Sequence, residues 1–371
     1  MTGKPRMCLV VTTHQTVNLI LRSQVQALSK EFELCLILDS PDLLVPSYAR
    51  GVTLLAVPDF KRGISVTSDL RAIFHCIKHI RKFKPEITHS FTPKAGLVCA
   101  LSAWVCRVPC RLHTFTGLIF PSESGFKGWV LRKIDGFICR LSTVVVAESL
   151  GVQRTLIREI KPSKEPIIIG AGNICGVDTD YYTAAASEQR DPAGPCRFLY
   201  AGRLAHDKGI ADLVDAFGRL DGRSELHLIG EEDQRDPVDE TVLDNIQRSN
   251  NIYLHGFKPD IRGSLANADY LILPSYREGF PNVVLQAMAS GVPVISSRVF
   301  GAEDVVVDDI TGWIFPIGDV EALARCMRSA ASLCETERYR VMSKNCRQLM
   351  INKYDSRQYL ESLLNFYSSL I

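Results

Sequence analysis

The stretch "DYLILPSYREGFPNVVLQAMASGVPVISS", residues 269–297, contains the repeating unit that decides the fold. Residues 269–275 and 292–297 are short apolar runs typical of buried strands, and a helical period lies between them at 282–290. Strands joined by a helix run parallel, because the helix supplies the crossover that parallel pairing needs. The stretch therefore predicts a βαβ unit, with the polar loop 276–281 at the carboxyl end of its first strand.

The same alternation extends along most of the 371 residues. Further helical periods lie at 17–30, 67–83, 93–106 and 127–140. The predicted strands are, in chain order, 7–13, 33–39, 52–57, 86–91, 111–116, 143–149, 166–170, 197–203, 225–230, 251–256, 269–275 and 292–297. Such alternation predicts an α/β protein whose parallel sheets carry helices on both faces.

Length and local composition favour two domains. A single core rarely grows past about 250 to 300 residues, and the periodic pattern stops at 183–196, "TAAASEQRDPAGPC". Small, polar, Pro and Gly residues of this kind are typical of a linker. We therefore expect a Rossmann-like domain over 1–182, a second over 197–352, and a C-terminal helix over 353–371 that packs back on the first domain.

Charge and cysteine content restrict the partners and the compartment. The net charge is +2, but residues 1–185 have a basic excess that the acidic remainder largely offsets. A basic first half suits an anionic membrane or a diphosphate-bearing acceptor, although solvated basic faces are equally common. The 12 cysteines are scattered and include no Cys-x-x-Cys pair, which favours reduced thiols and a cytoplasmic protein.

Two segments lead to a membrane hypothesis. "HCIKHIRKFK", residues 75–84, places Lys78, Arg81 and Lys82 within helical reach of one another, and "WVLRKIDGFICRL", residues 129–141, mixes cations with apolar residues. Helices of this composition suit the surface of an anionic leaflet. Amphipathic helices packed on a sheet are the alternative. Because the apolar runs are too short for a signal peptide or a membrane span, we expect peripheral attachment to the inner face of the plasma membrane.

Polar loops at the carboxyl ends of strands are the first places to look for a ligand of a parallel sheet. After the strand 197–203, Arg203 is followed by Lys208 and by a glycine that precedes a helix starting near Ile210. Two cations beside a helix N-terminus suit a diphosphate, because charges and unpaired backbone N–H groups point to the same place. A solvated turn is the alternative for this stretch.

Two further loops follow strands of the same sheet. Gly230, after "LHLI", lets a ligand approach the backbone. Glu278 stands before the helix at 282–290, where a carboxylate would repel phosphate but would accept hydrogen bonds from sugar hydroxyls. Its alternative role is to complement the helix dipole. Since all three loops follow strands of one sheet, together they predict a pocket for a sugar attached to a diphosphate.

These stretches carry a family resemblance. "GRLAHDKG", "HGFKPDI", "SYREGFPNVVLQAMASGVPVISS" and "TGWIF" resemble, in order and spacing, the C-terminal domain of family 4 retaining glycosyltransferases of the GT-B fold. "HSFTPKAGLVCALSAW", "RLHTFTGLIF" and "GNICGVDTDYY" are similar to the branch that assembles lipid-linked bacterial O-antigen, capsule and exopolysaccharide. The resemblance implies two Rossmann-like domains with a cleft between them.

The resemblance also implies roles for residues of the second domain. Arg203 and Lys208 would hold the donor diphosphate and stabilise it as it leaves. Glu278 and the backbone that follows it would hold the donor sugar. The predicted donor-binding set is Gly202, Arg203, Lys208, Gly230, Glu278, Gly279, Phe280, Pro281, Asn282 and Gln286.

Four further residues carry roles that the resemblance implies, with a departure from the family pattern or an alternative role. Gln286 stands where the family has a glutamate that contacts the nucleotide ribose, and its amide oxygen can still accept with similar reach. His113 matches a histidine that faces the donor sugar from the end of a strand, and a hydrogen-bonded core histidine is the alternative. Thr13 and His14 lie where relatives have a loop for the diphosphate and the acceptor, but the double glycine frequent there is absent.

No cofactor and no essential metal are predicted. "DTD", residues 178–180, resembles an Asp-x-Asp metal motif, but it follows "GNICGV", where the family has a structural turn. Arg203, Lys208 and a helix N-terminus can stabilise the leaving diphosphate instead. A retaining glycosidase needs two carboxylates about 5 to 5.5 Å apart, and we find no convincing pair. The resemblance implies a front-face substitution, in which the leaving phosphate takes the acceptor's proton.

Three functions are compatible with the sequence. The favoured one is transfer of a sugar, N-acetylated sugars included, from a UDP-linked donor to a polyprenyl-diphosphate-linked saccharide in surface polysaccharide biosynthesis. A UDP-sugar 2-epimerase on the same fold is the first alternative. The second is a nucleotide-sugar-binding protein with weakened catalysis, an option raised by Gln286. A nucleic-acid partner is not expected.

Overall fold

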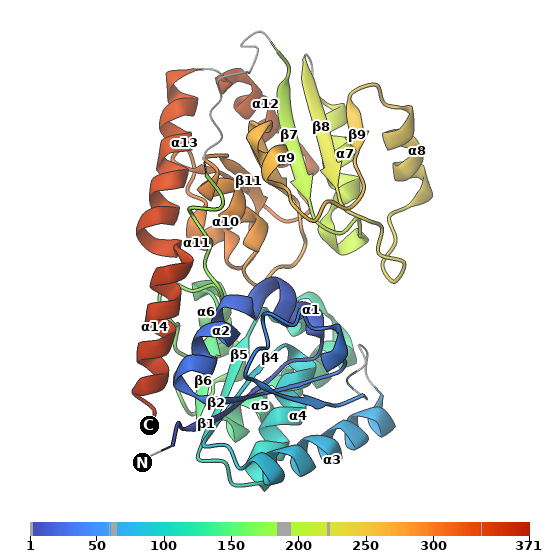
Figure 1. The fold of residues 1–371 in the computed structure, drawn as a ribbon. Coiled ribbons are helices and arrows are strands. Elements are labelled where there is room, and N and C mark those ends of the chain that lie inside the picture. The colour runs from blue at the N-terminus through green and yellow to red at the C-terminus, as the bar shows by residue number, and fades with distance from the viewer. Residues whose placement is uncertain (1–2, 59, 61–64, 184–193, 221–222, 335) are drawn as a thin grey trace. The chain divides into compact units, whose positions relative to one another are not determined.

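The computed structural model describes residues 3–58, 60, 65–183, 194–220, 223–334 and 336–371. The chain divides into two compact units (Figure 1). Unit 1 consists of Met1–Cys175 with Arg357–Ile371, and unit 2 of Gly176–Ser356. Most of the predicted linker, residues 184–193, lies outside the described residues, so its structure stays a prediction.

Unit 1 contains a six-stranded parallel sheet. The strands lie in the order β3 (Thr53–Ala56), β2 (Glu33–Leu38), β1 (Arg6–Val10), β4 (Ile87–Phe91), β5 (Cys110–Phe115) and β6 (Val144–Ala147). The chain runs outward from β1 to β3 and then crosses back to β4. The carboxyl ends of β1 and β4 are therefore the topological switch point of this sheet, the usual place for a ligand.

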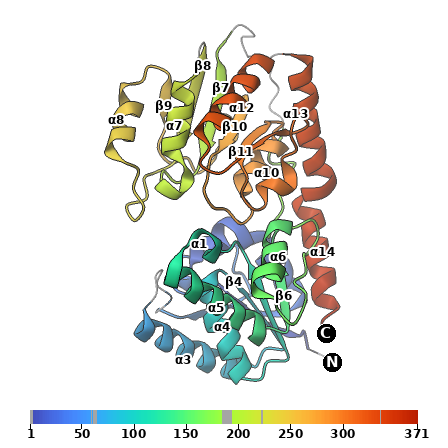
Figure 2. The same cartoon turned by 180° about the vertical axis from the view of Figure 1, so that it is seen from behind.

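Helices cover both faces of this sheet, as Figures 1 and 2 show. They are α1 (His14–Thr16), α2 (Arg22–Glu31), α3 (Val66–Phe83), α4 (Pro93–Val105), α5 (Gly125–Leu141), α6 (Leu150–Thr155) and α14 (Ser356–Ser368). On one face, α3 and α4 pack Cys76 and Val98 against Val10 of β1. On the other, α14 buries Tyr359 and Leu363 in the cluster that contains β1 and β2. The end of the chain thus completes the core of unit 1.

Unit 2 repeats the architecture with a second parallel sheet. Its order is β12 (Gly312–Phe315), β11 (Val294–Ser297), β10 (Tyr270–Leu273), β7 (Cys196–Ala201), β8 (Ser224–Ile229) and β9 (Ile252–Leu254). The chain runs outward from β7 to β9 and crosses back to β10. The switch point of this sheet therefore lies at the carboxyl ends of β7 and β10.

The helices of unit 2 enclose one large apolar core. They are α7 (Ile210–Gly218), α8 (Glu240–Arg248), α9 (Arg262–Ala266), α10 (Asn282–Ala289), α11 (Ala302–Val305), α12 (Val320–Leu333) and α13 (Glu337–Leu349). Leu213 of α7 and Leu323 of α12 pack with Phe198 and Tyr270 of the central strands. None of the described helices of either unit is long and apolar enough to cross a membrane.

The α/β prediction with two Rossmann-like domains is confirmed, with two differences among the strands. The predicted strand 166–170 was wrong, because Ile167 forms an isolated bridge to Val146. Gly170 and Gly172 then take positive φ values and turn the chain away from the sheet. Conversely, β12 was not predicted as a strand. It has four residues and opens with a glycine at φ +154°.

Candidate active site

Two glycines allow three loops of unit 2 to meet at the switch point. Gly209 has φ +68°, and a Cβ there would stand 2.2 Å from the carbonyl oxygen of Pro274. A Cβ on Gly230 would stand 1.8 Å from the carbonyl oxygen of Gly202. Both distances are too short for any side chain. The loops after β7, β8 and β10 therefore come together because these positions lack a Cβ.

Lys208 and Glu278 form an ion pair where the first and third loops meet. The Nζ of Lys208 lies 2.7 Å from Oε1 of Glu278, and the two side chains are 15% and 18% exposed. Ser275, which is fully buried, donates its hydroxyl to the same Oε1 at 2.8 Å. The sequence assigned these two residues to different parts of a ligand and did not predict their contact. Lys208 balances the charge of this carboxylate, which makes Glu278 compatible with the predicted diphosphate site next to it.

Arg203 extends from the end of β7 toward the loop that follows β8. Its guanidinium donates to Asp233 and lies 3.7 Å from the carboxylate of Asp207. Hydrogen bonds from Arg235, and also from Arg203, hold the pKa of the Asp233 carboxyl well below its usual range. The sequence analysis did not predict a role for Asp233. Its position at the end of a predicted strand, three residues after Gly230, was the signal that could have identified it.

Tyr276 joins the same loops and was also missed. Its backbone N–H donates to the carbonyl of Asp207 at 2.9 Å. Its hydroxyl donates to Asp212 in α7 at 2.8 Å. These two bonds connect the loop after β10 to both sides of the cationic loop. The positions of Lys208 and Glu278 are therefore fixed by backbone as well as by side chains.

The helix α10 begins directly behind the acidic loop, at Asn282. Pro281 is its N-cap residue, and the ring of Phe280 is buried with its centroid 5.9 Å from that of Tyr354. This packing holds the backbone of the predicted sugar-binding segment. Gln286 lies on the second turn of α10 and is partly buried. The structure thus gathers the predicted donor-binding residues of unit 2 around one end of its sheet.

Thr13 and His14 lie at the switch point of unit 1. Thr13 is the N-cap of α1, and the backbone N–H of His14 donates to Asp39 at 3.2 Å. Nδ1 of His14 lies 3.8 Å from the same carboxylate oxygen. Asp39 follows β2, so this loop is tied to the neighbouring strand.

The strand end next to it contains strained backbone that sequence reasoning did not detect. The hydroxyls of Thr12 and Thr92 lie 2.5 Å apart across the switch point. Thr92 has φ +73° and ψ 145°, a conformation that costs a β-branched residue free energy. Such strain clusters at functional sites. No pattern of side chains predicts a positive φ at a threonine, so the strained backbone at Thr92 could not be predicted from the sequence.

His113 lies inside β5 and not at a strand end, contrary to the prediction. The strand continues because Phe115 still pairs with Ala147 of β6. His113 is 1% exposed, and its Nδ1 lies 2.9 Å from the hydroxyl of Ser90. Burial lowers its pKa to about 3, so the ring is neutral. These contacts are those of a hydrogen-bonded core histidine, and the contact with a donor sugar stays a prediction.

The "DTD" segment forms a turn. The carboxylate of Asp178 accepts the backbone N–H groups of Asp180 and Tyr181 at 3.1 and 2.9 Å. The hydroxyl of Thr179 donates to Asp355 at 2.5 Å. Asp178 therefore stabilises its own turn, as Asp commonly does.

Two Rossmann-like units, one with cations and an acid gathered at its switch point, form the arrangement that the GT-B prediction requires. Residues 195–332 match the model of "Glycosyl transferases group 1", and residues 15–169 match that of "Glycosyl transferase 4-like domain". The chain belongs to this glycosyltransferase family, family 4, as the resemblance implied.

Similar proteins act in bacterial polysaccharide assembly. The chain is 28% identical over 375 residues to the capsular polysaccharide biosynthesis glycosyltransferase CapM of Staphylococcus aureus, covering 98% of this chain and 96% of CapM. It is 30% identical over 253 residues to the lipopolysaccharide core biosynthesis glycosyltransferase LpsE of Rhizobium meliloti, covering 68% and 67%. The protein is therefore a glycosyltransferase of the polysaccharide type.

A solved structure supports the fold. The HepE protein of Anabaena, in complex with UDP, superimposes with a TM-score of 0.81 over 98% of this chain and 100% of HepE. At 18% identity this likeness concerns the fold alone. It agrees with the GT-B prediction.

Proposed function

We propose that this enzyme transfers a sugar, with retention of configuration and without an essential metal, from a UDP-linked donor to a polyprenyl-diphosphate-linked saccharide. The observation that carries the proposal is the Lys208–Glu278 pair at the switch point of unit 2. It places a cation suited to a leaving diphosphate next to an acceptor of hydrogen bonds suited to sugar hydroxyls.

The names of similar proteins support both substrates. An Escherichia coli relative, 22% identical over 92% of this chain and 90% of its own length, is a "UDP-Gal:alpha-D-GlcNAc-diphosphoundecaprenol alpha-1,3-galactosyltransferase". HepE has been solved with UDP-glucose. These names favour transfer over the 2-epimerase alternative, and they favour UDP and a lipid diphosphate as the two substrates.

The proposed chemistry depends on charge that develops at the leaving group. Breaking the bond between sugar and phosphate places negative charge on the diphosphate, which Arg203 and Lys208 stabilise. Lys208 turns part of its hydrogen bonding from Glu278 to phosphate oxygens. Glu278 keeps the hydroxyl of Ser275 and accepts hydrogen bonds from the sugar. A phosphate oxygen takes the proton of the acceptor hydroxyl as the new bond forms on the same face.

We place this reaction at the inner face of the plasma membrane, where a lipid-linked acceptor resides. The proposal is supported by α5, where Phe126 and Trp129 are 79% and 55% exposed and their rings stack 5.8 Å apart. Lys133 lies 5.6 Å from the centre of the Trp129 ring. Exposed aromatic rings beside cations are suited to an anionic membrane surface.

One assay separates the three functions considered. Purified protein is mixed with a panel of UDP-sugars and with lipid extracted from polysaccharide-producing cells, and UDP release and labelled lipid are both measured. A transferase releases UDP and labels lipid only when both substrates are present. An epimerase converts the donor without steady UDP release, and a binding protein does neither. The reaction should continue in EDTA, and loss of turnover there would contradict metal independence.

A further inference from the structure

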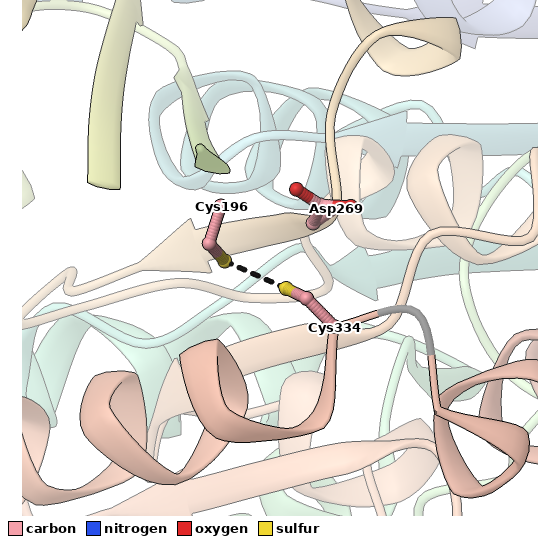
Figure 3. A group of neighbouring side chains, drawn as sticks. All are labelled: Cys196, Asp269 and Cys334. Atoms are coloured by element: carbon pink, nitrogen blue, oxygen red, sulfur yellow. Dashed lines mark hydrogen bonds between the residues drawn. The ribbon is translucent and has the colours of Figure 1, made fainter. Parts of the chain in front are cut away.

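Cys196, Asp269 and Cys334 form a cluster in unit 2 (Figure 3). The candidate active site lies at the carboxyl ends of the strands of this sheet, and the cluster lies at the other end. Cys196 opens β7, and Asp269 directly precedes β10, so both stand at the amino ends of central strands. Cys334 follows α12. Three elements that are distant in sequence therefore bring two thiols and one carboxylate to one place.

The three side chains lie close enough to share one ion. The two sulfur atoms are 2.9 Å apart, and one ligand atom from each residue lies within 4.8 Å of the others. Cys196 is 5% exposed and Asp269 is fully buried. Cys334 is partly exposed.

Asp269 is held in place by the backbone of β7. Its carboxylate oxygen Oδ2 accepts the N–H of Arg197 at 2.7 Å, and its own N–H donates to the carbonyl of Arg197 at 2.8 Å. The hydroxyl of Tyr339 donates to the carbonyl of Asp269 at 3.2 Å. The fixed carboxylate next to two thiols thus has the character of a preorganised ligand.

We propose that Cys196, Cys334 and Asp269 bind a thiophilic divalent cation such as Zn²⁺, which fastens β7 and β10 to the end of α12. Thiolate sulfur and carboxylate oxygen are both ligand types that Zn²⁺ accepts, and a water molecule would complete the tetrahedron. Binding releases one proton from each thiol, so each ion displaces two protons. At a zinc–sulfur distance of about 2.3 Å the two sulfurs stand roughly 3.8 Å apart, which requires them to separate by less than about 1 Å.

A disulfide is the competing use of this thiol pair. A disulfide would join the two sulfurs without involving Asp269, whereas a bound ion would be coordinated by all three side chains. The carboxylate is the reason for preferring the ion, and the two outcomes differ in mass, in proton release and in their dependence on Asp269.

The test is a titration of the full chain, kept reduced and freed of metal, with Cd²⁺ alone and then with Zn²⁺ as competitor. We expect one ion per chain, ultraviolet absorbance from cadmium–thiolate bonds, release of two protons per ion, and a rise in Tm of about 5 to 10 °C at saturating metal. Cys196→Ser and Cys334→Ser should each abolish the absorbance change at this site. Asp269→Asn keeps an acceptor for the N–H of Arg197 and should weaken binding at least tenfold.

Cys326→Ser is the matched control, since Cys326 lies on α12 but outside the cluster, and it should bind like wild type. Circular dichroism establishes that each variant is folded, and competition by Zn²⁺ in wild type tests the proposal even if a variant is not. Unchanged binding in Cys196→Ser would overturn the proposal. So would a Cys196–Cys334 disulfide in protein isolated without reductant, if no Cd²⁺ binds after reduction.

This inference is independent of the proposed transfer reaction. The cluster stands at the amino ends of the strands, so chelation should lower Tm and leave the initial rate of transfer unchanged well below Tm. A failed metal titration leaves the glycosyltransferase proposal intact, and a failed transfer assay leaves the metal site intact.

Discussion

Arg203 and Lys208 lie in the loop after β7, where each pairs with a carboxylate. The role of each residue can be tested by replacing it with Ala. Arg203→Ala or Lys208→Ala should lower kcat by roughly 10² to 10³, because each deletes one preorganised stabiliser of the leaving group. Initial rates of UDP release measure the effect. Arg235→Ala is the control, since Arg235 pairs with the same Asp233 that holds Arg203 but was not predicted to touch the donor. Near-normal turnover in both variants would contradict the diphosphate assignment.

Gln286 and Glu278 should respond differently to substitution. Gln286→Ala should mainly raise the donor KM, because ribose binding is shared by ground and transition states. Gln286→Glu should be tolerated or bind donor more tightly, by about 1 kcal/mol from charge assistance. Glu278→Ala should collapse kcat, because in the proposed reaction Glu278 positions the transferring sugar, and it also balances the charge of Lys208. If wild type binds UDP-sugar but transfers nothing, and Gln286→Glu restores transfer, Gln286 is disabling and the protein is a binding protein.

His113 should influence stability through pH. Burial lowers the pKa of both His89 and His113 to about 3. Below about pH 6.5 both rings become protonated in the unfolded chain, whereas in the folded chain they stay neutral until the pH approaches 3. Asp135 acts oppositely, because burial raises its pKa to about 7 and the folded form takes its proton first. For these three groups the net effect is about one proton, so together they should lower the free energy of unfolding by about 1.4 kcal/mol per pH unit as the pH falls from roughly 6 to 4.5. Burial also lowers the pKa of His255, which adds to the same trend.

His113→Asn should remove one of these protons and flatten that slope. Urea unfolding at pH 6.0 and 5.0, for wild type and variant, measures it. A variant that keeps the wild-type slope but loses turnover would instead favour the predicted contact between His113 and the donor sugar.

Among the elements, α14 has the clearest effect on the core of unit 1. The hydroxyl of Tyr367 lies 2.5 Å from Nδ1 of His89, whose Nε2 lies 2.7 Å from the hydroxyl of Thr114. Tyr367→Phe keeps the ring packing and leaves one buried imidazole nitrogen without its partner. We expect it to cost about 1 to 3 kcal/mol of unfolding free energy, measured by urea at pH 7.5. Tyr48→Phe is the control, because Tyr48 is only partly buried, and it should change stability by less than about 0.5 kcal/mol.

The strands also explain which residues of the candidate site could be predicted from the sequence. Arg203, Lys208 and Glu278 were identified because each follows a recognisable strand, and the carboxyl end of a parallel strand is the expected place for a ligand. Asp233 also follows a strand, but its importance comes from its contact with Arg203, which lies in the loop after another strand. Such contacts depend on the order of the strands in the sheet, and this order cannot be predicted from any single segment of the sequence.

At the scale of the molecule, the membrane hypothesis rests on the exposed side chains of α3 and α5. Replacing Phe126 and Trp129 together with Ser should lower binding to anionic vesicles at least tenfold, because the apolar contact and the ring under Lys133 are lost. Flotation with phosphatidylglycerol vesicles at low salt measures it. Leu43→Ser is the control, as Leu43 is also in unit 1 and is 55% exposed. Equal binding of all three proteins, or no binding by wild type, would contradict the hypothesis.

The sequence by itself determined the α/β class, the resemblance to family 4 and the cationic and acidic loops, because periodicity and strand-end chemistry are local properties of the chain. The tertiary structure decided which side chains meet. It paired Lys208 with Glu278, brought Thr12 to Thr92, placed His113 inside β5 and gathered two cysteines with Asp269. The physical reason is that these contacts join segments that are far apart in the sequence, so they exist only after the sheets have ordered their strands and the core has closed around them.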